Sequence, residues 1–162
     1  MGRKDLAERR GAVERMGLTA GERVLATGQT QAGGWLLATT ARLGVVDEVG
    51  GVIVGEWCEI NHAKLGSGEI LTVTWGDERE TIVARLTGGS RRLAAVVNER
   101  VTRSVVATRR VETDGGAVRV AIRRASDGGL FSQVIAPPGV DADVAELREA
   151  ERDLREAVGL DG

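Results

Sequence analysis

The single histidine of the chain, His62, has a cysteine and a glutamate close before it. Cys58 lies four positions and Glu59 three positions upstream, so a helical turn would bring all three side chains near a metal ion. A closed zinc site needs four ligands, usually several Cys and His, and the chain has one of each. We therefore expect no metal here, a buried Cys58 and a partly exposed His62.

The chain contains none of the familiar catalytic motifs. A Ser-His-Asp triad would have to use His62, and no Gly-x-Ser-x-Gly elbow surrounds any serine. The glycine pairs at 33–34 and 50–51 match no dinucleotide or phosphate-loop pattern. Asp and Glu are plentiful, but nothing singles out a carboxylate pair. The sequence predicts no catalytic residue and no cofactor.

Residues 88–125 are rich in arginine. They hold nine arginines against three acidic residues, a charge of +6, whereas residues 126–162 have a charge of −6. One interpretation is that the two segments neutralise each other. The other is a cluster of guanidinium groups that binds carboxylate or phosphate.

Strand alternation indicates which arginines could share a face. In 118–124, apolar residues alternate with Arg119 and Arg123, so both arginines should project from the face opposite the core. Only one of Arg109 and Arg110 can join them, and we choose Arg110. We predict that Arg110, Arg119 and Arg123 bind a partner; the alternative is that they pair with Glu112 and the acidic final helix.

Three tryptophans could form a ligand-binding surface, although such residues at strand ends are more often core or rim residues. They are Trp35, Trp57 and Trp75. Trp35 is the candidate for a ligand surface, because Gly33-Gly34 places it beside a loop.

Three helices are predicted. The first covers residues 4–16 and stops at Gly17. The second begins with Ser90 as its N-cap and gives way to a strand around residues 102–104. The third is capped by Asp141 and runs to about Val158.

Short β-rich runs with glycine turns fill the rest of the chain, as in antiparallel sandwiches and barrels. The first series covers residues 22–28, 35–39, 42–47, 52–57, 69–75 and 80–86, with a loop at 29–34 and an ambiguous segment at 58–65. The second covers 105–112, 118–124 and 130–136, joined by Asp-Gly-Gly turns. The sequence predicts an α+β fold: an antiparallel β-barrel closed by a helix, then a three-stranded β-meander and a C-terminal helix.

The bulk properties are those of one globular domain in a reducing compartment. The chain has 162 residues, 42% hydrophobic and 28% charged, and its one cysteine cannot form an internal disulfide. The N-terminus has no signal-peptide pattern, and no apolar run is long enough for a membrane span. We expect a cytoplasmic protein with a short N-terminal helix, 1–17, and a single domain, 18–162, divided into 18–105 and 106–162.

Three stretches resemble an uncharacterised actinobacterial protein family with a pleckstrin-homology-like barrel: residues 34–39, 53–60 and 98–106. The resemblance implies a barrel of six or seven strands closed by the Ser90 helix, and it implies no reaction. Phosphoinositide-binding members of this fold class place Lys and Arg in the first hairpin loop, but residues 29–34 contain no cation. This argues against phosphoinositide binding.

We expect a non-enzymatic binding module that holds a protein partner at a sheet edge or at the arginine face. One alternative is a nucleic-acid-binding protein using residues 88–125, although the net charge is −2 and no aromatic residues are interleaved for base stacking. The other is an enzyme with unrecognised carboxylate chemistry. The sequence leaves open whether the chain forms a homo-oligomer.

Overall fold

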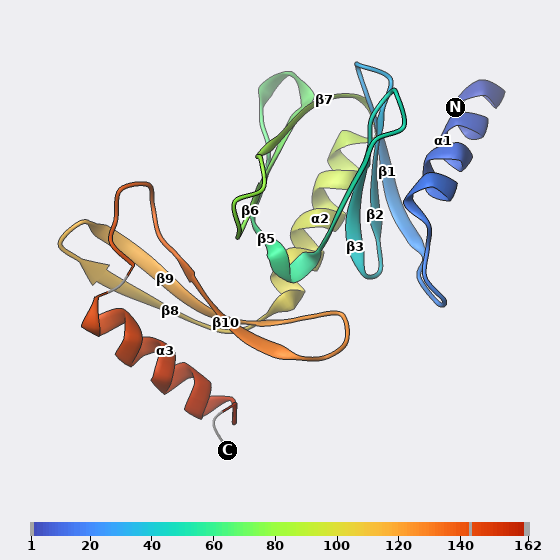
Figure 1. Ribbon diagram of the computed structural model, residues 1–162. Helices are drawn as coiled ribbons and strands as arrows, with labels where there is room; N and C mark the ends of the chain where they lie inside the picture. Colours follow the sequence, from blue (N-terminus) through green and yellow to red (C-terminus); the bar gives the residue numbers. More distant parts are fainter. Residues whose placement is uncertain (1, 143, 161–162) are drawn as a thin grey trace. The chain divides into compact units, whose positions relative to one another are not determined.

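The computed structural model describes residues 2–142 and 144–160, so the outer ends of the predicted domain ranges, Met1 and 161–162, lie outside the described residues. The chain divides into two compact units, one up to Val101 and one from Thr102 onward. Each unit combines antiparallel strands with helices (Figure 1). The predicted α+β class is therefore confirmed.

The first unit is built on a seven-stranded antiparallel sheet that curls into a half-barrel (Figure 1). Its strand order is β4-β3-β2-β1-β7-β6-β5. The strands are β1 (Val24–Thr30), β2 (Trp35–Thr39), β3 (Arg42–Val46), β4 (Val52–Glu56), β5 (Ile60–Leu65), β6 (Ile70–Trp75) and β7 (Ile82–Gly88). β1 and β7 pair only near their C-terminal ends, through Gln29 with Gly88 and Thr30 with Leu86.

Strand β2 shows how the sheet separates an inner layer from an outer one. Leu36 and Ala38 belong to the inner core, together with Leu93 and Val97 of helix α2 (Ser90–Ser104). Figure 1 shows α2 in the hollow of the curled sheet. The alternate residue Trp35 packs on the other face in a cluster with helix α1 (Arg3–Met16).

Most strand boundaries in this unit differ from the sequence prediction by one or two residues, and two differences at the ends of elements have a structural reason. β1 continues to Thr30, because the strand pairs with β2 as far as Gln29 opposite Trp35 and then with β7; the predicted loop at 29–34 is shorter. Ser90, predicted as the N-cap residue that precedes the helix, is instead the first residue of α2. Its hydroxyl donates to Glu69.

The ambiguous segment at 58–65 is a short 3-10 helix followed by a strand. The helix, η1, spans Trp57–Glu59 and leads directly into β5. A second 3-10 turn, η2 (Ser67–Glu69), joins β5 to β6. No described helix of the chain has the length and apolar character needed to cross a membrane.

The second unit is a three-stranded antiparallel meander with one helix, as predicted. Its strands β8 (Val105–Thr113), β9 (Gly116–Arg124) and β10 (Leu130–Ile135) lie in the order β10-β9-β8, and helix α3 spans Ala145–Ala157. Leu147 and Ala150 of α3 pack against Val118 and Val120 of β9. α3 therefore covers the apolar face of this sheet.

The prediction that Asp141 caps the last helix is wrong. α3 begins at Ala145, with Val144 in the N-cap position and no side-chain cap. The proline-rich turn extends further than expected, because the Val140 N–H bonds back to the Pro137 carbonyl. The chain leaves this turn at Asp141 and needs several more residues to reach the helix.

Candidate functional site

The second unit brings two of the three predicted arginines together. Arg110 of β8 lies directly opposite Arg119 of β9, on the face that α3 does not cover. Arg119 is exposed, and with the residues that the structure describes it makes neither an ion pair nor a side-chain hydrogen bond. The Arg110 side chain is 72% exposed, and its Nε donates to Glu112 Oε1 at 2.7 Å.

Arg123 does not project into solvent, contrary to the prediction. It is 1% exposed. Its Nε and Nη2 donate to the Ser104 hydroxyl at 3.0 and 2.7 Å, and Nη1 donates to Gln133 Oε1 at 2.9 Å. Alternation gave the correct face of the strand but not the depth of the side chain. We call the pair Arg110 and Arg119 the arginine face.

The predicted alternative, pairing with the final helix, applies to a different arginine. Arg109 pairs with Asp153 of α3 through Nη1 and Oδ2 at 2.8 Å. Arg109 lies opposite Val120 and so shares the face that α3 covers. The helix therefore neutralises Arg109 and leaves Arg119 without a counter-ion from it.

One of the two edges of the first sheet, strand β4, is partly occupied by side chains of the same unit. On edge strand β4, the Val54 carbonyl accepts a hydrogen bond from Arg79 Nη1 at 3.3 Å, and the Glu56 N–H donates to Glu59 at 2.5 Å. Side-chain bonds of this kind compete with the pairing of another strand. At these two positions the backbone of β4 already has side-chain partners, whereas Arg119 has none among the described residues.

Cys58 and Glu59 belong to the 3-10 helix η1, whereas His62 belongs to a strand. Cys58 is buried, and its Sγ lies 3.5 Å from Glu56 Oε2. His62 is exposed on β5, so it does not share a helical turn with Cys58. Within the described part of the chain, no group of three or more His, Cys, Asp or Glu could hold a metal ion.

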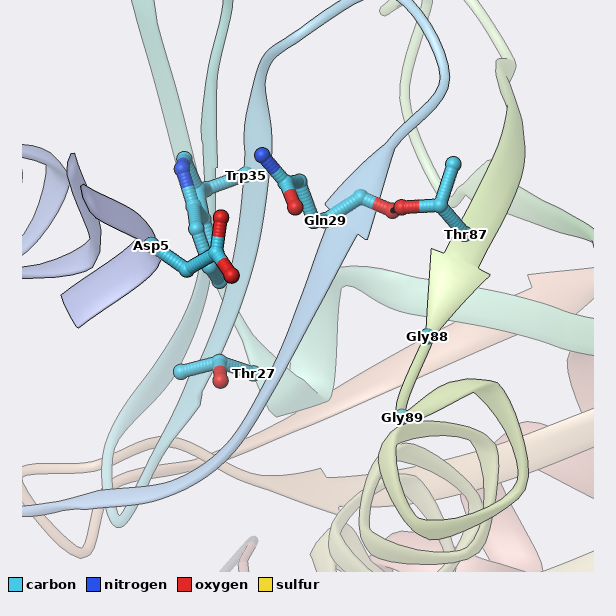
Figure 2. A pocket seen from close by; sticks show the side chains of 7 residues that line it. All are labelled: Asp5, Thr27, Gln29, Trp35, Thr87, Gly88 and Gly89. Carbon is cyan, nitrogen blue, oxygen red and sulfur yellow. Dashed lines mark hydrogen bonds between the residues drawn. The ribbon is translucent and has the colours of Figure 1, made fainter. Parts of the chain in front are cut away.

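A cavity of about 350 Å³ in the first unit is the second candidate site (Figure 2). Its walls are Asp5, Thr27, Gln29, Trp35, Thr87, Gly88 and Gly89. Trp35 is 5% exposed, and its indole Nε1 is buried without an acceptor among the described residues. Trp35, the predicted candidate for a ligand surface, therefore forms one wall of this polar cavity.

Strand register places the residues of β1 and β2 on one wall. Gln29 lies opposite Trp35, and Thr27 opposite Leu37, on the outer face of the sheet. Ala12 and Met16 anchor α1 on this face. The Asp5 carboxylate then points from α1 toward the space beside the Trp35 indole (Figure 2).

The opposite wall is the end of β7 and the start of α2. Gly89 has φ +71°, and a Cβ built on it would lie 2.7 Å from the Thr27 carbonyl oxygen. Only glycine fits such a close approach in this backbone region. Gly88 and Gly89 therefore bring the backbone close to β1 without filling the cavity with side chains.

Hydrogen bonds leave several acceptors of the cavity available. Asp5 Oδ2 accepts the Gly2 N–H at 3.0 Å, and Gln29 Nε2 donates to Glu8 at 3.3 Å. The Thr87 hydroxyl donates to the Gln29 carbonyl at 3.3 Å. Asp5 Oδ1, Gln29 Oε1 and the Thr27 hydroxyl have no partner among the described residues, and the walls include no cationic side chain.

The other two tryptophans are core residues. Trp57 and Trp75 are 6% and 3% exposed. Trp57 Nε1 donates to the Thr39 carbonyl at 3.1 Å, and the Arg79 guanidinium lies 4.2 Å from the Trp75 ring. Neither ring lines the cavity beside Trp35.

Asp5, Thr27 and Gln29 are the functional candidates that sequence reasoning missed. They come from a helix and a strand whose contact depends on the tertiary fold, and no local motif marks them. Comparison of the chain with protein-family models, with curated proteins and with solved structures found no match.

Proposed function

We propose that this chain is a non-enzymatic binding module whose arginine face contacts an acidic segment of a protein partner. The observation that carries the proposal is the position of Arg119, which lies directly opposite Arg110 without an ion pair to any described residue. Like charges at directly opposite positions of neighbouring strands destabilise a sheet by up to about 1 kcal/mol. Folding does not require this arrangement, whereas binding of an anionic group would offset its cost.

The chemistry of the face favours carboxylates of a protein. Guanidinium groups bind carboxylates through paired, parallel hydrogen bonds. Glu112 beside Arg110 reduces the local positive charge, and the whole chain has a net charge of −2. Nucleic-acid binding depends mainly on many phosphate contacts, which this small face does not supply.

We further propose that the protein is cytoplasmic and that its first unit is a pleckstrin-homology-like half-barrel closed by α2. Support for the closure comes from Leu93 and Val97 of α2, which are 0% exposed within the inner core. Support for a non-phosphoinositide ligand comes from the β1–β2 connection, which carries no cationic residue. The resemblance of residues 34–39, 53–60 and 98–106 to such a family points the same way.

A charge reversal at Arg119 tests the proposed function. The probe is an oligo-glutamate peptide, with binding measured by calorimetry at low and at physiological ionic strength. Arg119→Glu should weaken binding by about tenfold or more, since a charge-assisted hydrogen bond contributes about 1.5–3 kcal/mol. The matched control is Arg152→Glu, an exposed position on α3, which should bind like the wild type.

Two results would overturn the proposal. One is equal binding of the peptide by wild type and Arg119→Glu when both have the same melting temperature. The other is tighter binding of a single-stranded oligonucleotide of matched charge, which would move the assignment to nucleic acid.

A further inference from the structure

We propose that the cavity beside Trp35 binds a small organic cation through a primary ammonium group. This site lies in the first unit, among residues of α1, β1, β2 and β7. It shares no residue with the arginine face, so the inference goes beyond the proposed function and does not depend on it.

The unpartnered acceptors of the cavity match the donors of an ammonium ion. A primary ammonium has three N–H donors and no acceptor. The cavity offers a carboxylate oxygen of Asp5, the amide oxygen of Gln29 and the hydroxyl of Thr27, none of which has another described partner (Figure 2). A carboxylate that accepts from a charged donor forms the stronger, charge-assisted kind of hydrogen bond.

The electrostatic surroundings also favour a cation. The walls contain no Lys or Arg, while Glu8 lies beside the cavity, bound to Gln29. Lys4 is on the same helix, but its ammonium pairs with Glu8 at 3.8 Å and its side chain is 88% exposed. The accessible part of the Trp35 indole adds an aromatic wall, and aromatic rings attract cations.

The size of the cavity limits the ligand. Ligand sites commonly enclose about 300–1,000 Å³, and this one, at about 350 Å³, is at the lower end. A short alkyl chain of a few carbons fits this space beside the indole. We therefore take n-butylammonium as the probe and n-butanol, similar in size but neutral, as its comparison.

The indole N–H signals in a proton–nitrogen NMR spectrum provide the readout. The chain has three tryptophans. The indole signal that is missing from the spectrum of Trp35→Phe identifies Trp35. Butylammonium should shift the Trp35 signal in a saturable way and leave those of Trp57 and Trp75 nearly unchanged. Butanol should cause at most a small shift, and added salt should weaken the ammonium effect.

Variants of single acceptors test the geometry. Asp5→Asn should weaken butylammonium binding by about tenfold or more, because it removes the charge and keeps a side chain that can still accept the Gly2 N–H. Glu14→Gln, on the exposed side of the same helix and outside the cavity, should bind like the wild type. Thr27→Val should weaken binding about threefold or more by removing one neutral acceptor.

Three outcomes would overturn the inference. They are the absence of a saturable Trp35 shift, equal affinity for butylammonium and butanol, and unchanged affinity in both Asp5→Asn and Thr27→Val. Thr27→Val serves as the independent variant if Asp5→Asn loosens α1. Arg119→Glu should bind butylammonium normally, so failure of this inference can be distinguished from failure of the proposed function.

Discussion

At the residue scale, the first unit contains a buried charge whose environment keeps it ionised. The Glu22 side chain is 1% exposed, and Arg42 Nε lies 3.0 Å from its Oε1. Burial by itself would raise the pKa of Glu22, but hydrogen bonds from Arg42 and then from Thr39 and Thr19 outweigh it and lower the pKa to about 2. Glu22 therefore links the segment before β1 to strand β2 through Thr39 and to strand β3 through Arg42.

The low pKa of Glu22 predicts a loss of stability in acid. The carboxylate stabilises the folded chain above the ordinary value of 4.5, and this contribution disappears as the pH falls through about 2. Between about pH 5 and pH 2, the free energy of unfolding should fall by about 3 kcal/mol more in the wild type than in Glu22→Gln. Urea titrations followed by tryptophan fluorescence measure this difference, because all three tryptophans lie in the first unit. Parallel pH profiles of the two proteins would contradict the prediction.

Arg119 and Arg123 lie on one face of β9 but should respond differently to charge reversal. Arg123→Glu would place a carboxylate at a position that is 1% exposed and bonded to Ser104 and Gln133. We expect a loss of about 3–5 kcal/mol, because the substitution leaves an uncompensated buried charge. Arg119→Glu should change stability by less than about 0.5 kcal/mol or increase it slightly, because it removes a like-charge pair. Denaturant titrations followed by circular dichroism measure the free energy of unfolding of the two variants. Equal losses of stability in Arg123→Glu and Arg119→Glu would refute the assignment of Arg123 as a structural residue.

At the element scale, glycines set how closely the helices of the first unit approach the sheet. A Cβ on Gly44 of β3 would lie 2.4 Å from the sulfur of Met16, and one on Gly28 of β1 would lie 2.8 Å from Leu93. Met16 belongs to α1 and Leu93 to α2, so these glycines leave room on opposite faces of the sheet. This explains how α1 is held on the sheet although few of its residues are buried.

The start of α2 provides a matched pair of glycines for a test. Gly89→Ala combines a positive φ with a clash against the Thr27 carbonyl, whereas a Cβ on Gly88 meets nothing within 4 Å. The left-handed conformation alone costs a residue with a Cβ about 1–2 kcal/mol. We therefore expect Gly89→Ala to destabilise the first unit by more than about 2 kcal/mol and Gly88→Ala by less than about 1 kcal/mol. Urea titrations followed by tryptophan fluorescence measure the free energy of unfolding of both variants. Similar losses of stability in Gly89→Ala and Gly88→Ala would contradict this view of the turn.

At the scale of the whole molecule, the chain has separate hydrophobic cores in its two units. The clusters around Leu36 and around Trp35 belong to the first unit, and the cluster of Val118, Val120, Leu147 and Ala150 belongs to the second. A cavity made in one core should therefore weaken its own unit most. The weakened unit should then open locally more often than the other unit.

Val120→Ala tests this separation. Val120 is 0% exposed, so the substitution should destabilise the second unit by about 1–3 kcal/mol. Hydrogen exchange followed by mass spectrometry should show faster exchange in β8, β9, β10 and α3 and a smaller change in β1–β7. Val73→Ala, at a position that is 0% exposed in the inner core of the first unit, should show the reverse pattern. Uniform acceleration over the whole chain in both variants would show that the cores unfold as one.

The sequence by itself determined most of the elements and their order. Glycine turns and two-residue alternation predicted β2 with its observed bounds and the three strands of the second unit to within a few residues. Alternation also required that only one of Arg109 and Arg110 share the face of Arg119, and the register shows that it is Arg110, the residue chosen. These features are local, because backbone turn preferences and the period of a strand depend only on neighbouring residues.

Only the tertiary structure decided how deep a side chain lies and which distant residues meet. Arg123 and Arg119 have the same place in the alternation, yet one is buried and the other exposed. The cavity beside Trp35 needs Asp5 from α1 and Gly89 from the start of α2, which are separated by most of the first unit's sequence. Burial and cavity walls depend on packing between elements far apart in the chain, and strand periodicity contains no information about that packing.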